Sequence, residues 1–134
     1  MPTNPVHVTP VVVEELDAPV EGRSDLEESS VTWRTLLSGD RTPTESLTLG
    51  VADVEPIGAT EPRVHHHAQA EVYYVLSGEG IVRVGDRDHP LRTGTTVFIP
   101  GNVEHGAIAT GTETLRILYV FAADSFSEVE YVFP

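Results

Sequence analysis

The chain has 134 residues, of which 40% are hydrophobic and 22% charged, a composition typical of one globular domain. It contains no Cys, which excludes disulfide bonds and thiolate metal sites. Its 21 acidic residues oppose eight basic residues, all Arg, and the formal net charge of −13 repels phosphate backbones. We therefore expect no nucleic-acid partner.

Other features of the composition bear on where the protein works. No apolar run approaches the ~20 residues that span a bilayer, and the polar start of the chain is unlike a signal peptide. We therefore expect no membrane partner and a location in the cytoplasm. The absence of Lys agrees with either the codon bias of a GC-rich genome or a salt-rich cytoplasm.

The first 30 residues differ in composition from the rest. Residues 1–30 are rich in Pro, Asp, Glu and Ser and are expected to form an N-terminal arm. Within this arm we expect a short edge strand at residues 11–13 and a short helix or solvated loop over residues 21–30. Residues 31–134 are expected to form the single folded domain.

From residue 31 onward, short runs of strand-forming residues are separated by turn residues. Tight turns are expected at Gly85-Asp86 and at Ser77-Gly78. Many short strands without a long helix predict an all-β sandwich or barrel. The predicted strands are residues 31–37, 46–54, 63–67, 71–76, 80–84, 95–99, 105–110, 115–121 and 128–133.

Four of the six histidines fall in two short segments, VHHHAQAE (residues 64–71) and the dipeptide at 104–105. Side chains alternate along a strand, so His65 and His67 point to one side and His66 to the other. Glu71 follows after three small or polar residues, which allow a turn, and His105 follows a Pro-Gly-Asn turn. Three imidazoles and one carboxylate that converge predict a site for one divalent transition metal, and this donor set suits Fe, Mn, Ni, Co or Zn.

The spacing of these residues follows a longer pattern. It reads His-x-His-x3-Glu-x6-Gly from His65 to Gly78, and Gly-x5-Pro-x-Asn-x2-His from Gly94 to His105. These blocks resemble the paired motifs of the cupin superfamily. The resemblance implies a single-domain cupin jelly-roll β-barrel with a short N-terminal arm.

Two positions depart from the family pattern. A glycine expected near the first motif lies one residue too far upstream, at Gly58, and Ala109 stands where the family often has Asn. Neither position is a ligand in the family. Carried over by the resemblance, the metal ligands are His65, His67, Glu71 and His105. His66 and His89 fall outside the pattern and are expected at the surface, and His7 lies in the arm.

Several stretches resemble the small cupin-type dimethylsulfoniopropionate lyases. They are TLGVADVE (48–55), EVY (71–73), GNVEH (101–105) and FSEVEY (126–131). In those lyases tyrosines act as the base, which implies that Tyr73 removes a proton and Tyr131 assists or binds substrate. Tyr73 lies two residues after Glu71, so in a strand it shares the face of that residue. Trp33, Tyr119 and Phe121 are candidates to hold the cationic sulfonium group of such a substrate.

The fold alone does not select a reaction. The sequence predicts a metal-dependent lyase acting on a small β-substituted carboxylate. It leaves open an iron-dependent dioxygenase or other oxidoreductase using the same four ligands, an isomerase, and a non-catalytic protein that binds a metal or small molecule. A homodimer is also expected, because pairing covers an exposed sheet edge.

Overall fold

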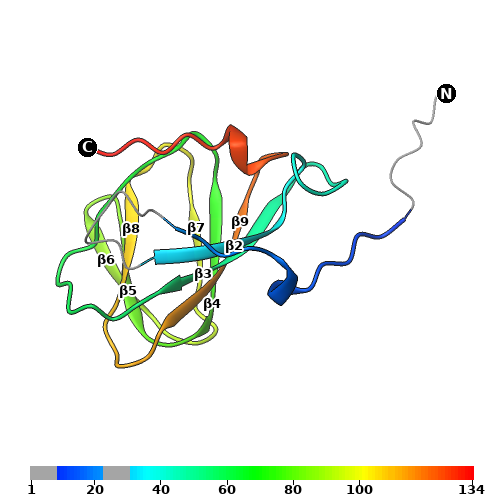
Figure 1. Ribbon diagram of the computed structural model, residues 1–134. Coiled ribbons are helices and arrows are strands. Elements are labelled where there is room, and N and C mark those ends of the chain that lie inside the picture. The colour runs from blue at the N-terminus through cyan, green and yellow to red at the C-terminus, as the bar shows by residue number, and fades with distance from the viewer. Residues whose placement is uncertain (1–8, 23–30) are drawn as a thin grey trace.

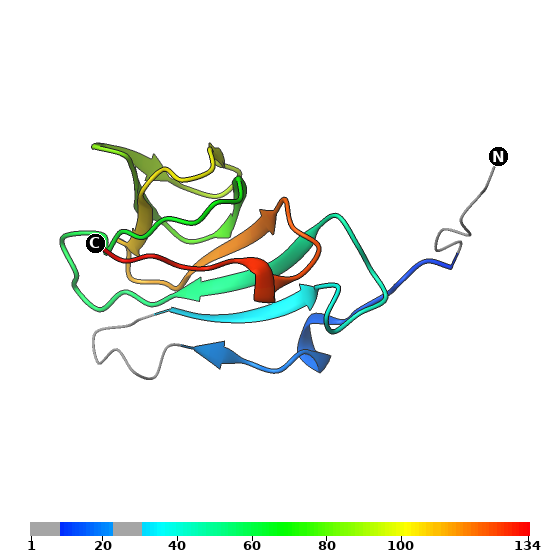
Figure 2. The ribbon, with the colours of Figure 1, turned by 90° about the horizontal axis from the view of Figure 1, so that it is seen from above.

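The computed structural model describes residues 9–22 and 31–134, which form two antiparallel β-sheets (Figure 1). The larger sheet has six strands in the order β1-β2-β3-β9-β4-β7, and the smaller has three in the order β6-β5-β8. Figure 2 shows the two sheets as separate layers. The predicted all-β jelly-roll is confirmed, with the described strands stacked as two sheets rather than hydrogen-bonded into a closed cylinder.

The strands are short, as the spacing of turn residues predicts. Those of the larger sheet are β1 (Glu21–Gly22), β2 (Val31–Leu37), β3 (Thr48–Val54), β4 (Glu71–Ser77), β7 (Thr96–Ile99) and β9 (Leu115–Phe121). Those of the smaller sheet are β5 (Gly80–Val84), β6 (Arg87–Leu91) and β8 (His105–Ala109). Two 3-10 helices, η1 (Glu15–Asp17) and η2 (Phe126–Glu128), complete the described elements, and none of these is a helix long and apolar enough to cross a membrane.

Strand β9 is the central strand of the core. It pairs with β3 on one side and with β4 on the other, and its alternate residues Leu115, Ile117, Tyr119 and Phe121 are buried. They pack against buried residues of both sheets, such as Val75 of β4 and Val82 of β5. The inner faces of the two sheets therefore share one core, and residues that point inward from β4, β8 and β9 meet at its centre.

The described part of the N-terminal arm lies against the outer side of the large sheet. The guanidinium of Arg34 on β2 donates to the backbone carbonyls of Glu15 and Ala18, and Arg116 on β9 pairs with Glu15 and Asp53. Glu21–Gly22 adds the short strand β1 to β2. The edge strand predicted at residues 11–13 is wrong, because that segment pairs with no strand among residues 9–22 and 31–134. Most of the predicted helix or loop over 21–30 lies outside the described residues.

The two predicted turns have different outcomes. Gly85-Asp86 closes the β5–β6 hairpin, with Val84 paired to Arg87, as predicted. Ser77-Gly78 does not close a hairpin, because β4 and β5 belong to different sheets and the chain crosses between them there.

The C-terminal segment (residues 126–134) is also not the strand predicted over 128–133. It begins with η2 and then makes one isolated pairing, between Val132 and His66. In Figures 1 and 2 this segment, in red, runs along one side of the sandwich. It therefore lies beside the segment that carries the histidines.

Candidate metal centre

The histidine segment is an extended chain held on both sides, rather than the full strand predicted over 63–67. His65 exchanges two backbone hydrogen bonds with His105 of β8, with N–O distances of 3.0 and 2.9 Å. His66 exchanges two with Val132, at 2.9 and 2.8 Å. These pairings fix the alternation of the side chains, so His65 and His67 face the interior and His66 faces away.

The three inward histidines form a cluster. One ring nitrogen each of His65, His67 and His105 lies within 4.8 Å of the other two. His67 and His105 are buried and His65 is half-buried. The carboxylate of Glu71, at the start of β4 and 4% exposed, joins them, with its Oε1 at 3.2 Å from His67 Nε2 and 3.1 Å from His105 Nε2. The structure thus brings together the four residues that the sequence singles out as metal ligands.

The hydrogen bonds of these rings set their tautomers. Nδ1 of His67 lies 2.9 Å from the carbonyl of Gln69, and Nδ1 of His105 lies 2.8 Å from the carbonyl of Val103. A carbonyl only accepts, so each Nδ1 carries the proton, and in the neutral imidazole each Nε2 is a bare acceptor. Both Nε2 atoms nevertheless face the Glu71 carboxylate, which is also an acceptor.

This arrangement fits a cation. The Nε2 lone pairs of His67 and His105 and the Oε1 atom of Glu71 lie close together with no proton between them. A positive ion bound there would interact favourably with all three atoms. Backbone carbonyls that fix the outer nitrogens are also the usual partners of metal-binding histidines. The donor set of three imidazoles and one carboxylate suits a divalent transition metal and does not select among them.

The two tyrosines proposed as catalytic contact different histidines of the cluster. Tyr73 projects inward from β4 with its ring centroid 6.2 Å from that of His105. Tyr131, from the C-terminal segment, has its ring 4.6 Å from His65 and 5.3 Å from His67. Burial, followed by the negative charges of Glu71 and Tyr131, raises the pKa of Tyr73 well above its ordinary value.

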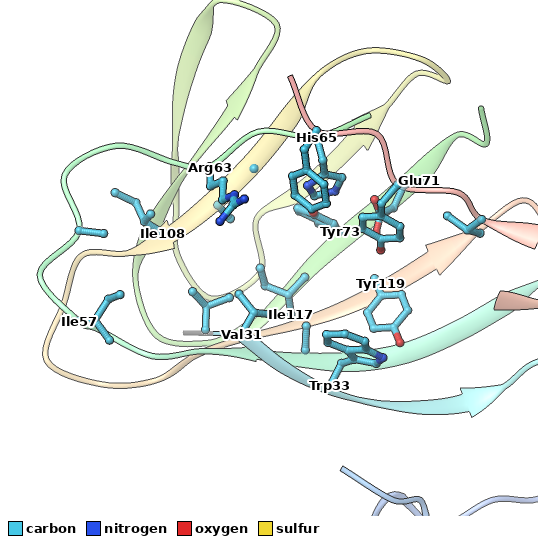
Figure 3. Close-up of a pocket in the computed structure, with 18 of the residues that line it drawn as sticks. Val31, Trp33, Ile57, Arg63, His65, Glu71, Tyr73, Ile108, Ile117 and Tyr119 are labelled. Carbon is cyan, nitrogen blue, oxygen red and sulfur yellow. The ribbon is translucent and has the colours of Figure 1, made fainter. Parts of the chain in front are cut away.

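A cavity of about 770 Å³ opens beside the cluster (Figure 3). Its walls come from both sheets, from the loop that precedes His65 and from the C-terminal segment. Trp33 and Tyr119 line it, as expected of aromatic residues that would hold a cationic group. Phe121 does not line it; its fully buried ring packs instead against His67, with centroids 5.1 Å apart.

An arginine and a phenylalanine of the cavity wall are among the lining residues missing from the sequence-based set. Arg63 and Phe133 both line the cavity, and the Arg63 guanidinium carbon lies 5.1 Å from the centre of the Phe133 ring. The alternation that pairs His65 with His67 also places Arg63 on the inner side, so the pattern could have identified Arg63. Nothing in the sequence indicates where Phe133 folds back.

The remaining histidines lie away from the cluster or outside the described residues. His89 is exposed, as expected. His66 is half-buried rather than a surface residue, and its Nδ1 is enclosed without a hydrogen-bond partner among the described residues. His7 lies outside the described residues.

Comparison with known protein families and sequences gives a consistent result. The family model described as Cupin domain matches residues 50–121. The chain is 37% identical over 124 residues to the dimethylsulfoniopropionate lyase DddW of Ruegeria pomeroyi, which covers 92% of this chain and 80% of that protein.

Solved structures agree on the fold. The polyketide cyclase RemF from Streptomyces resistomycificus superposes with a TM-score of 0.71 at 23% identity, over 93% of this chain and 85% of that chain. A crystal structure of FeII HppE has a TM-score of 0.67 at 26% identity, over 83% of this chain and 60% of that chain.

Proposed function

This chain belongs to the cupin family, and we propose that it is a metal-dependent lyase that cleaves a small β-substituted carboxylate. The leading substrate is dimethylsulfoniopropionate, which would give dimethyl sulfide and acrylate. One observation carries the proposal. Two phenols, Tyr73 and Tyr131, lie beside the histidine cluster in a chain that is 37% identical to a dimethylsulfoniopropionate lyase over 92% of its length.

His65, His67, Glu71 and His105 would hold the metal, since their donor atoms converge from three separate segments of the chain. The chemistry that a divalent metal supplies when bound is Lewis-acid stabilisation of the negative charge that develops as a proton α to a carboxylate is removed. The donor set is compatible with Fe, Mn, Ni, Co or Zn.

Tyr73 is the proposed base. Its pKa is raised by burial, so the phenol is neutral in the cavity and must lose its proton before turnover. Positive charge brought close to its oxygen favours that loss. The tyrosinate oxygen then takes the α-proton, the electron pair of that C–H bond forms the new C=C bond, and the C–S bond breaks with its electrons leaving on dimethyl sulfide. Tyr131 assists this step or binds the substrate.

The aromatic part of the cavity is suited to the cationic end of this substrate. Trp33 and Tyr119 both line the wall, and a sulfonium group over an aromatic face is attracted to the negative face of the ring. This contact needs no carboxylate and leaves Glu71 available to the cluster.

Proton nuclear magnetic resonance tests the lyase proposal across the substrate class. Metal-loaded protein is incubated with dimethylsulfoniopropionate and with other β-substituted propionates, beside a chelator-treated sample. We expect vinylic signals of acrylate that depend on metal. Their absence from every substrate with every metal would contradict the proposal.

An iron-dependent oxidoreductase is a second candidate, supported by the likeness to a structure that contains FeII. It would use the same four ligands and consume oxygen. It predicts oxygen uptake that requires ferrous iron and that is unaffected by the Tyr73→Phe substitution. An oxygen electrode separates it from the lyase, which needs no oxygen.

A further inference from the structure

The cavity has one arginine among the described residues that line it, Arg63. We propose that Arg63 binds the carboxylate of the substrate and thereby fixes the orientation of the substrate in the cavity. This inference deepens the proposed function and rests on it for the identity of the substrate, although the carboxylate contact can be tested alone.

Most of the other described arginines are already engaged. Arg41 pairs with Glu21 at 2.8 Å, and Arg83 lies 2.6 Å from Glu61 and 2.7 Å from Asp88. Arg116 pairs with Asp53, and Arg34 donates to backbone carbonyls. Although the chain has 21 acidic residues, Arg63 forms no ion pair with a carboxylate among the described residues.

Glu61 would be the nearest competitor, because it also lines the cavity and lies two residues before Arg63. Its carboxylate is instead held by Arg83 on β5, at 2.6 Å. The guanidinium of Arg63 rests on the ring of Phe133, 5.1 Å from the ring centre. A cation over an aromatic face keeps its N–H groups free at the edge of the guanidinium, where a carboxylate can accept two hydrogen bonds.

The backbone at Arg63 is fixed close to the metal cluster. Two residues later, His65 exchanges two hydrogen bonds with His105. The carbonyl of Arg63 packs so closely on Gly106 that a Cβ there would lie 2.3 Å from it. Residues two apart in an extended chain project to the same side, and Figure 3 shows the side chains of Arg63 and His65 in the same part of the cavity wall.

This placement implies an orientation for a zwitterion. The carboxylate lies toward Arg63 and His65, and a cationic end is repelled by Arg63 and lies toward the faces of Trp33 and Tyr119. The cavity would therefore select molecules whose anionic and cationic ends are a short chain apart. Arg63 is a binding and positioning residue in this account, and it transfers no proton.

The fluorescence of Trp33 tests the contact, because it is the only Trp in the chain and it lines the cavity. Metal-loaded protein is titrated with propionate and with its neutral isostere propionamide, and calorimetry repeats each titration. We expect Arg63→Gln to weaken propionate binding about tenfold and to leave propionamide unchanged. Arg63→Lys, which keeps the charge, should bind propionate with an affinity between those of Arg63→Gln and the unaltered chain.

Arg92→Gln is the matched control, since Arg92 is exposed, as Arg63 is, but does not line the cavity. It should bind propionate as the unaltered chain does. Circular dichroism and metal content establish that each variant is folded and loaded. Propionate affinity that is the same in Arg63→Gln and in the unaltered chain would overturn the proposal. If Arg63→Gln selectively loses propionate binding while the unaltered chain releases no dimethyl sulfide, the carboxylate contact of Arg63 is supported and the lyase proposal is rejected.

Discussion

His67 and His105 each use one ring nitrogen to fix the orientation of the ring and leave the other for the cluster. Because backbone carbonyls accept hydrogen bonds from the Nδ1–H groups, the Nε2 atoms of the neutral rings and the Glu71 carboxylate face each other as acceptors. Such a site is unfavourable when empty and favourable with a cation. A bound cation removes the repulsion between these acceptors, and this gain contributes to metal affinity.

The His67→Ala substitution tests this at the level of one residue. It removes one buried imidazole nitrogen of the proposed metal site, and we expect bound metal to fall from about one ion per chain to a small fraction of that. His66→Ala is the control, because His66 faces away from the cluster and should leave the metal content unchanged. Elemental analysis after dialysis measures both variants. Equal metal loss in the two variants would contradict the conclusion that His67 faces the cluster and His66 faces away from it.

The Tyr73→Phe substitution tests the base. It removes one oxygen from a buried side chain, and we expect kcat for the lyase reaction to fall by about 10²–10⁴-fold with metal content unchanged. Tyr74→Phe is the control, since Tyr74 is 43% exposed and projects from the other face of β4. Initial rates of acrylate formation compare the two. A Tyr73→Phe variant with full activity would leave Tyr131 as the candidate base.

At the level of elements, the site forms where four parts of the chain meet. The histidine segment lies between β8 and the C-terminal segment, and β4 supplies Glu71 and Tyr73. The contact of the histidine segment with β8 depends on Gly106, where a Cβ would be 2.3 Å from the carbonyl of Arg63. Only a residue without a side chain permits this approach.

Gly106→Ala is therefore expected to destabilise the fold by about 1–3 kcal/mol, since backbone must move to relieve the overlap. Gly111→Ala is the control, because a Cβ there would meet nothing closer than 3.7 Å. The urea midpoint, at constant m-value, measures both. A Gly106→Ala midpoint equal to that of the unaltered chain would show that β8 and the histidine segment can separate without cost.

Elements with strong alternation could be predicted from the sequence, and those without it could not. Strand β9 was predicted with both ends correct, because every second residue is buried. Strand β6, Arg87–Leu91, was not predicted, since four of its five residues are exposed and one is Pro. The C-terminal segment has apolar alternation, yet its single pairing with His66 is a tertiary contact that no local pattern reveals.

The four candidate ligands can be selected from the sequence alone, and their role as metal ligands stays a prediction. The spacing of His65, His67, Glu71 and His105 identifies four side chains that the structure brings together. Tyr131 was selected by the family resemblance and not by spacing, since its place beside His65 follows from the path of the C-terminal segment. Alternation could have added Arg63 to the set.

At the scale of the whole molecule, buried tyrosines link stability to alkaline pH. Burial raises the pKa of Tyr119 to about 12. In the unfolded chain this group loses its proton near pH ~10, so its contribution is fully present below that pH and is lost as pH rises toward 12. We expect Tyr119→Phe to reduce the fall in unfolding free energy across this range by up to ~1.4 kcal/mol per pH unit.

Urea unfolding at a series of pH values between these limits measures this effect. The Tyr73→Phe variant should show a reduction in the same direction, because the pKa of Tyr73 is also raised by burial. Unfolding free energies that fall equally steeply in Tyr119→Phe and in the unaltered chain would contradict the linkage.

The net charge of −13 and the expected homodimer also belong to this scale. Strands β1 and β7 are the edges of the large sheet, and Phe98 on β7 is 65% exposed. The homodimer stays a prediction, and salt that screens the acidic surface would favour its formation.

Headspace gas chromatography for dimethyl sulfide is the most direct test of the proposed lyase activity. Purified protein is loaded in parallel with Fe(II), Mn(II), Ni(II), Co(II) and Zn(II) and supplied with dimethylsulfoniopropionate. We expect release that depends on metal, that Tyr73→Phe lowers by about 10²–10⁴-fold and that Tyr74→Phe retains. No dimethyl sulfide from the fully loaded protein with any of the five metals would contradict it.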